Sequence, residues 1–342
     1  MVVAIPGIMR RATMMCYLWR LLFAIAGGIA LLPLGAQAQT NAKVYRIGWL
    51  DMTSPDLRSP SRVAFDEELR LRGYVEGQNL VVERRNAAGR IDLLPALARE
   101  LVALRPDLIV AATPPPSRAA KDATSTIPIV IIGVADPVGL GLVASLAHPG
   151  GNVTGVTTLV PGHLSGKGMQ LLHEMVPSAK RIAVLVNPTN EMHRLVQQEI
   201  SQAALQIGVD LQFHQARTAD EIEPALQAAI AGRAEALAVI GDSVFNNPPA
   251  RLPQLVARTK LPAIYLLRTQ VEAGGLMSYG PDFVDLSRRL AGYVDRILKG
   301  ANTGDLAIEQ PTKFQLVINR KTAKALGLTI PQSILLTAEV ID

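Results

Sequence analysis

Cysteine and aromatic residues are scarce in this 342-residue sequence. The single cysteine, Cys16, lies within the first 38 residues, which have the pattern of a removable leader. The remaining chain therefore has no disulfide bonds and no thiolate metal ligands, and it is long enough to bury a core without them. Aromatic residues make up 4% of the sequence, and Trp49 is the one tryptophan after the leader. This scarcity disfavours the stacked aromatic platform that sugar binding usually needs.

Catalytic and cofactor motifs are missing as well. An enzyme on a doubly wound sheet, for example a hydrolase or a dehydrogenase, needs a nucleophile with its base or a cofactor loop. The sequence has no G-x-S-x-G turn. Residues 139–144 fit G-x-G-x-x-A, but no acidic residue follows about 20 positions later to bind a ribose. The five histidines occur singly, which disfavours a metal site. We therefore predict no enzyme, no cofactor and no metal.

The first 38 residues are typical of an export signal. Arg10, Arg11 and Arg20 precede an apolar run over residues 21–34, and Ala-Gln-Ala follows at residues 36–38. A charged start, a short apolar run and small residues at the cleavage site define a secretory signal peptide. An uncleaved membrane anchor is the alternative, but the run falls short of the roughly 20 residues that a membrane span needs. We predict cleavage near Ala38 and a periplasmic protein.

The charge of the chain argues against a nucleic-acid partner. The full sequence has a net charge of +5, which falls to +2 once the three arginines of the leader are removed. No dense basic stripe with interleaved aromatic residues occurs. We expect a monomer that binds a small molecule.

Short apolar runs alternate with amphipathic stretches from residue 45 onward. Strands are expected at residues 45–50, 80–84, 108–112 and 129–134, and again, after the turn at 148–152, at 181–186, 209–214, 236–240 and 263–266. The intervening stretches have the length and apolar spacing of helices, including residues 117–123 and 140–146. Strands that alternate with helices form parallel sheets. The sequence therefore predicts the α/β class, with two doubly wound parallel-sheet lobes.

Small polar residues follow the expected strands. Ligands of parallel sheets bind beyond the carboxyl ends of the strands, and helix starts there favour small anions or zwitterions. The candidate ligand-binding residues are Thr53, Thr113, Ser117, Asp136, Asn187, Thr189, Asp242, Ser243, Tyr279 and Asp282. The alternative for Ser117, Asp136 and Asp282 is simple capping of a helix.

Four stretches of sequence carry a family resemblance. They are IPIV (127–130) leading to DPVG (136–139), HPGGNVTG (148–155), SYGPD (278–282), and QPTKF (310–314) together with LGLTIP (326–331). In these stretches the chain resembles the exported substrate-binding proteins of ABC transporters with the type I periplasmic binding fold, a group that includes binders of tryptophan and related amino acids. The resemblance covers essentially the whole chain after the leader.

The resemblance implies how the chain is organised. Two lobes joined by a three-strand hinge would close over a solute and deliver it to a membrane permease. The expected domains are residues 1–38 as the signal peptide, 39–155 with 280–300 as the first lobe, and 156–279 with 301–342 as the second. Thr53, Thr113 and Asp136 would contact the solute from the first lobe. Asn187, Thr189, Asp242 and Tyr279 would contact it from the second lobe and the hinge.

One departure from the family pattern lies at residues 113–117, which read TPPPS. Relatives usually carry glycine or small residues there, whereas three prolines remove backbone donors. This argues against a contact with an amino-acid carboxylate at that loop. The sequence thus predicts a solute-binding protein of an ABC importer for a small polar molecule, an amino acid or a related organic acid among the options. A periplasmic sensor domain that partners a membrane signalling protein is the alternative.

Overall fold

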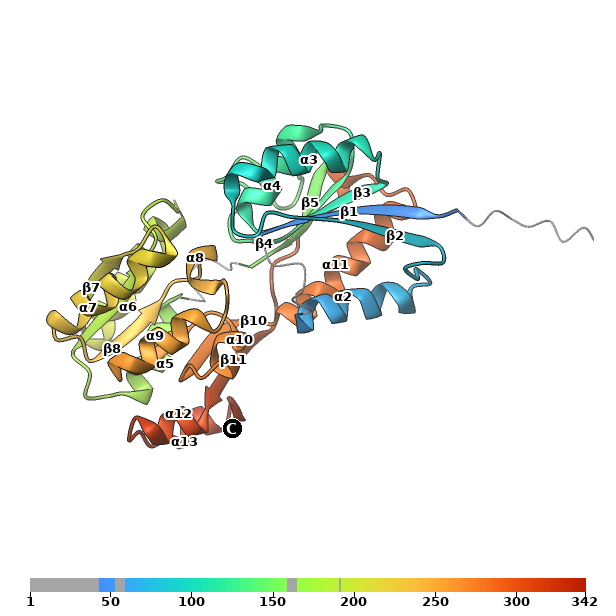
Figure 1. The fold of residues 1–342 in the computed structure, drawn as a ribbon. Helices are drawn as coiled ribbons and strands as arrows, with labels where there is room; N and C mark the ends of the chain where they lie inside the picture. The colour runs from blue at the N-terminus through green and yellow to red at the C-terminus, as the bar shows by residue number, and fades with distance from the viewer. Residues whose placement is uncertain (1–42, 53–58, 159–164, 191) are drawn as a thin grey trace, which may run out of the picture. The chain divides into compact units, whose positions relative to one another are not determined.

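The computed structural model describes residues 43–52, 59–158, 165–190 and 192–342. The expected signal peptide, with its cleavage near Ala38, and the candidate residue Thr53 lie outside these ranges. The described chain forms two sheets, each flanked by helices (Figure 1). Within these ranges we find no helix with both the length and the hydropathy that crossing a membrane requires.

The first lobe contains a five-stranded parallel sheet in the order β2-β1-β3-β4-β5. The strands are β1 (Tyr45–Asp51), β2 (Leu80–Asn86), β3 (Leu108–Ala112), β4 (Ile129–Val134) and β5 (Val153–Thr157). Ile47 and Trp49 of β1 pack with α2 (Pro60–Leu71) and α11 (Phe283–Leu298) on one face of the sheet. Leu50 packs with α3 (Leu94–Ala103) and α4 (Pro114–Ala123) on the other face. Because helices cover both faces, the strands are apolar along nearly their whole length.

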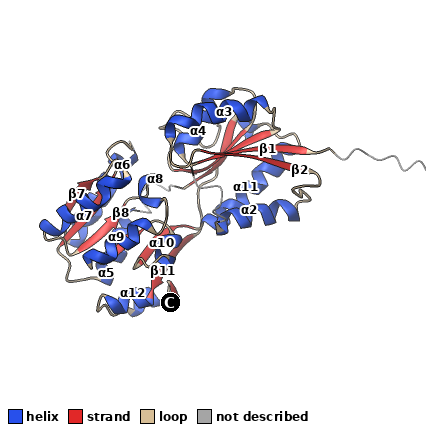
Figure 2. Ribbon diagram, in the orientation of Figure 1, coloured by secondary structure: helices blue, strands red, loops and turns tan. Residues whose placement is uncertain are grey.

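The second lobe contains a seven-stranded sheet in the order β12-β11-β10-β9-β8-β6-β7. The strands are β6 (Arg181–Val186), β7 (Asp210–Gln215), β8 (Ala236–Val239), β9 (Ala263–Tyr265), β10 (Met277–Pro281), β11 (Phe314–Asn319) and β12 (Glu339–Ile341). One face packs against α5 (Ser165–Met175), α6 (Met192–Ile207), α12 (Arg320–Ala325) and α13 (Gln332–Leu335). The other packs against α7 (Ile222–Ala231), α8 (Ser243–Asn246) and α9 (Arg251–Thr259). The layering of helices and strands is visible in Figure 2.

The remaining elements are short. The helix α10 (Arg268–Glu272) precedes β10, and three single 3₁₀ turns are η1 (Ile91–Leu93), η2 (Ala219–Glu221) and η3 (Thr303–Asp305).

Two expectations about secondary structure need correction. The second sheet is not wholly parallel, because β11 runs antiparallel to β10. The expected helix at residues 140–146 is instead a series of turns, in which Gly141 has a φ of +63° and the amide of Leu142 bonds back to the carbonyl of Pro137. Gly141 interrupts a continuous helix here, since it takes a left-handed conformation.

The chain passes between the two lobes three times. It leaves the first sheet after β5, returns from β10 to α11, and leaves again after Glu309, which forms a bridge with Val156 before β11 begins. The sequence analysis placed residues 301–309 in the second lobe. This segment forms hydrogen bonds with the first lobe: Thr303 Oγ1 donates to the carbonyl of Gly151 at 2.9 Å, and Thr154 Oγ1 donates to that of Leu306 at 2.6 Å. We therefore propose a boundary near residue 310.

Candidate functional site

The strand order defines one switch point in each sheet. In the first lobe, β1 lies between β2 and β3, so the chain leaves β1 towards one side and later crosses to the other. In the second lobe, β6 lies between β7 and β8 in the same way. A crevice opens at such a point, because the loops after the two strands diverge, and ligands of open α/β sheets bind there. The relevant loops are those after β1 and β3 and those after β6 and β8.

Asp242 organises the switch point of the second lobe. This carboxylate follows β8 and is 6% exposed. It accepts hydrogen bonds from Asn187 Nδ2 at 3.2 Å and from Asn190 Nδ2 at 2.8 Å, both of which follow β6. It also caps α8 by accepting from the amide of Val244 at 2.9 Å. The loops after β6 and β8 are thereby tied together at the edge where a ligand is expected.

Asn187 also shapes its own loop. Its Oδ1 accepts from the amide of Thr189 at 3.0 Å and from Thr189 Oγ1 at 2.8 Å, which closes a tight Asx turn. The structure thus brings together Asn187, Thr189 and Asp242 from the predicted set. Ser243 follows as the first residue of α8.

His193 belongs to this network, although the sequence analysis treated it as an isolated histidine. Its Nδ1 accepts from the amide of Asn187 at 2.9 Å, and its Nε2 lies 3.3 Å from the carbonyl of Gly241 and 3.6 Å from Asp242 Oδ2. Burial lowers the pKa of His193, against an opposing effect of Asp242. We therefore assign the proton to Nε2 of a neutral ring. His193 lies one helical turn after Asn190, at the start of α6. This position in the sequence could have identified it as a member of the network.

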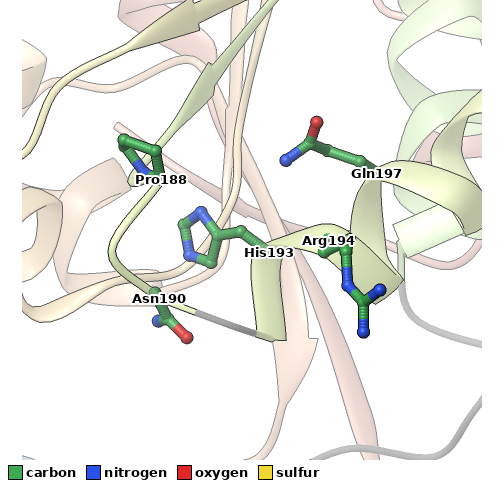
Figure 3. Close-up of a pocket in the computed structure, with 5 residues that line it drawn as sticks. All are labelled: Pro188, Asn190, His193, Arg194 and Gln197. Atoms are coloured by element: carbon green, nitrogen blue, oxygen red, sulfur yellow. The ribbon is translucent and has the colours of Figure 1, made fainter.

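A pocket of about 430 Å³ opens beside this network and is lined by Pro188, Asn190, His193, Arg194 and Gln197. Figure 3 shows the His193 ring beside Pro188 and Asn190, with Arg194 and Gln197 contributed by the same helix, α6. Arg194 is exposed. The lining offers amide, imidazole and guanidinium groups, which bind polar solutes.

In the first lobe, the loop after β3 passes directly into α4. Prolines occupy residues 114–116 in the first turn of this helix, where proline fits the backbone, so α4 begins three residues earlier than expected. Thr113 precedes them with φ +73° and ψ 163°, a conformation nearly confined to glycine. The hydroxyl of Ser117 donates to the carbonyl of Thr113 at 2.7 Å. Among the described residues, the buried Oγ1 of Thr113 has no hydrogen-bond partner.

The loop after β1 begins at a buried cluster around Asp51, which the candidate set did not include. Trp49 Nε1 donates to Asp51 Oδ2 at 2.8 Å, and Asn86 Nδ2 donates to Oδ1. The guanidinium of Arg62 lies 3.7 Å from Asp51 Oδ2 and 3.3 Å above the Trp49 ring. Burial lowers the pKa of Arg62 to about 10. Asp51 is the last residue of a buried strand, and this position in the sequence could have identified it as a candidate residue.

Three further candidates have local structural partners. Asp136 Oδ1 accepts from the amide of Gly139 at 2.8 Å, and Asp282 caps α11 by accepting from the amides of Val284 and Asp285. The contacts of Asp282 match the capping alternative, whereas the bond of Asp136 closes a turn and caps no helix among the described residues. Tyr279 of β10 stacks on Phe314 of β11 at 6.0 Å between ring centroids, and burial raises its pKa. In the described ranges, no group of three or more His, Cys, Asp or Glu side chains is placed to hold a metal ion.

Comparison with known proteins identifies the family of this chain. The family model described as ABC transporter substrate binding protein matches residues 50–341. A tyrosine-binding protein of Clostridioides difficile (strain R20291) is 28% identical over 289 residues, which are 84% of this chain and 82% of that protein.

Two solved structures are similar over nearly the whole described chain. One is a conserved domain protein from Vibrio cholerae, with a TM-score of 0.81 and 29% identity, covering 88% of this chain and all of the other. The second is an ABC domain in complex with L-Trp from Streptococcus pneumonia, with a TM-score of 0.80 and 26% identity, covering 87% of this chain and all of the other. The chain therefore belongs to the ABC transporter substrate-binding protein family, whose members bind solutes and are not enzymes.

Proposed function

We propose that this protein captures an aromatic amino acid, or a close relative of one, for an ABC importer. The solute would bind between the switch points of the two lobes, and the three crossings would act as the hinge. Ligand then stabilises the closed form by its greater affinity for that form. Thr113, Asn187, Thr189 and Asp242 are the contacts that we favour, with Tyr279 beside the crossing into α11.

The observation that carries the proposal is the polar network around Asp242. Its members come from the two loops that flank one switch point, and their amide groups are fixed before any solute arrives. Groups held in this way lose little conformational entropy on binding, which favours affinity for a small polar ligand. The relatives named for tyrosine and L-Trp support the choice of solute class.

Export and transport complete the proposal. The signal-like first 38 residues would direct the chain to the periplasm, with removal near Ala38. There the protein would act as a monomer and deliver its solute to the membrane subunits of a permease.

The test is a calorimetric titration of the purified protein with L-tyrosine and L-tryptophan. We expect one site per chain. The Kd should rise at least about tenfold in Asp242→Ala, because the amide groups that bind the solute would no longer be held by the Asp242 carboxylate.

Asn319→Ala is the matched control. Asn319 is also buried and caps a short helix of the same lobe, α12, by accepting from the amide of Thr322 at 2.9 Å. Because β11 runs antiparallel to β10, its end lies at the opposite edge of the sheet. Loss of binding in both variants, or in neither, would contradict the proposed site, and a folded wild-type protein that binds neither amino acid would contradict the proposed solute.

A further inference from the structure

The start of α4, which follows β3, is a place at the first-lobe switch point where a helix could present amide hydrogens to a ligand. A helix normally has unpaired amide hydrogens in its first turn, and these bind carboxylates and phosphates. In α4 the first three positions are Pro114, Pro115 and Pro116, which have no amide hydrogen. The fourth amide, that of Ser117, donates to the carbonyl of Thr113 at 3.2 Å. This helix start therefore offers no backbone donor to an anion.

The side chains at this turn also suit an uncharged group. The Ser117 hydroxyl is committed to the carbonyl of Thr113, and the Thr113 amide donates to the carbonyl of Ile132 at 2.8 Å. The buried Oγ1 of Thr113 is left with unused hydrogen-bonding capacity among the described residues. A single hydroxyl beside proline rings can contact a neutral polar or apolar group, but it cannot balance a carboxylate.

The second-lobe switch point has the opposite character. Asp242 is a buried carboxylate whose partners in the described chain are the neutral donors Asn187, Asn190 and the amide of Val244. The nearby His193 ring accepts a backbone hydrogen bond at Nδ1, so it is neutral and adds no positive charge. A buried negative charge whose hydrogen-bond donors are all neutral attracts a cation from solution.

We propose that this protein selects its solute through an ammonium group held near the Asp242 network, and that a carboxylate on the solute is not required for binding. The inference rests on the proposed solute-binding function, and it deepens that function by defining the solute class as small aromatic amines, with or without a carboxylate. The neutral part of the solute would lie against Thr113 and the prolines of α4.

The experiment compares three probes that share one ring. Tyramine keeps the ammonium group of tyrosine and lacks the carboxylate, whereas 3-(4-hydroxyphenyl)propionate keeps the carboxylate and lacks the ammonium group. By calorimetry we expect tyramine to bind within about threefold of tyrosine, and the propionate to bind at least about tenfold more weakly, since one charge-assisted hydrogen bond accounts for such a factor.

The outcomes separate this inference from the proposed function. Tyrosine binding at least tenfold more tightly than tyramine would overturn the inference and leave the proposed function intact. Tyramine binding without tyrosine binding would support the inference and overturn the amino-acid assignment. Binding of the propionate alone, or of none of the three probes, would overturn both.

A second variant tests directly whether the prolines of α4 exclude a carboxylate. The double substitution Pro115→Ala, Pro116→Ala restores two amide hydrogens at the start of α4 while keeping residues that favour a helix. We expect the affinity for the propionate to rise about tenfold, and the affinity for tyramine to change by less than that. Pro95→Ala, in the first turn of α3, is the matched control and should change neither. No gain for the propionate in the double variant would overturn the claim that the prolines exclude the carboxylate.

Discussion

Acidification is expected to destabilise the second lobe through His193. Burial lowers the pKa of this ring in the folded protein, while the unfolded chain keeps the ordinary value of about 6.5. The unfolded state therefore binds the proton more readily. Stability from the neutral ring is present above pH of about 6.5 and is lost as the pH falls towards the folded-state pKa.

The structure sets the size of the effect. Protonation of Nδ1 removes the acceptor of the Asn187 amide, which is buried, and an unsatisfied buried donor costs about 1–3 kcal/mol. Asp242, at 3.6 Å from Nε2, opposes this loss because it favours the charged ring. Linkage limits the slope from one such group to about 1.4 kcal/mol in the free energy of unfolding for each pH unit.

Urea unfolding at several pH values between 7.5 and 5 measures this slope. His193→Gln keeps a polar side chain that does not titrate, so the pH dependence of the variant should be shallower than that of the wild type by up to that limit. His214, whose pKa is also lowered by burial, contributes with the same sign, and His214→Gln serves as the control that removes this second group alone. Equal slopes for His193→Gln and the wild type would refute the assignment of a buried neutral ring.

Three further substitutions test other contacts. Asp295→Asn weakens the hydrogen bond from Tyr74, 2.9 Å in length, and should lower the free energy of unfolding by about 1–3 kcal/mol in urea titrations. Thr113→Gly should stabilise the ligand-free protein by about 1 kcal/mol because the strained backbone relaxes, and it should weaken solute binding in calorimetry. Gly155→Ala should lower the melting temperature by several degrees, since its φ is +138° and an added Cβ would lie 2.2 Å from a carbonyl oxygen. Gly151→Ala is the control: an added Cβ meets no atom within 4 Å, so the melting temperature should not change.

The apolar pattern predicted most of the fold. Strands that are buried on both faces are continuous apolar runs, and their alternation with helices defines parallel sheets. The reversed direction of β11 could not be predicted from such a pattern, because it depends on the path that the chain takes through the first lobe between α11 and Phe314. The hydrogen bonds between residues 301–309 and the first lobe come from the hydroxyls of Thr303 and Thr154 and from backbone groups such as those of Ile308 and Leu146, and neither kind carries a periodic signal.

The sequence predicted part of the polar network in the second lobe. The rule that ligands collect at the carboxyl ends of strands identified Asn187, Thr189 and Asp242, which the structure brings together. His193 was missed because it lies on a helix, and only the fold brings its ring to the amide of Asn187. Asp51 was passed over because its partners come from β2 and α2, which are distant in the sequence.

A thermal-shift screen of the purified protein against amino acids, aromatic amines, organic acids, nucleosides and sugars tests the central claim most directly. A solute that binds only the native state stabilises it by about 2.7 kcal/mol at 100 times its Kd, which raises the melting temperature. The account predicts a shift with aromatic amino acids and their amines, and none with sugars or nucleosides. A folded protein that shifts with none of these classes, or with sugars alone, would contradict it.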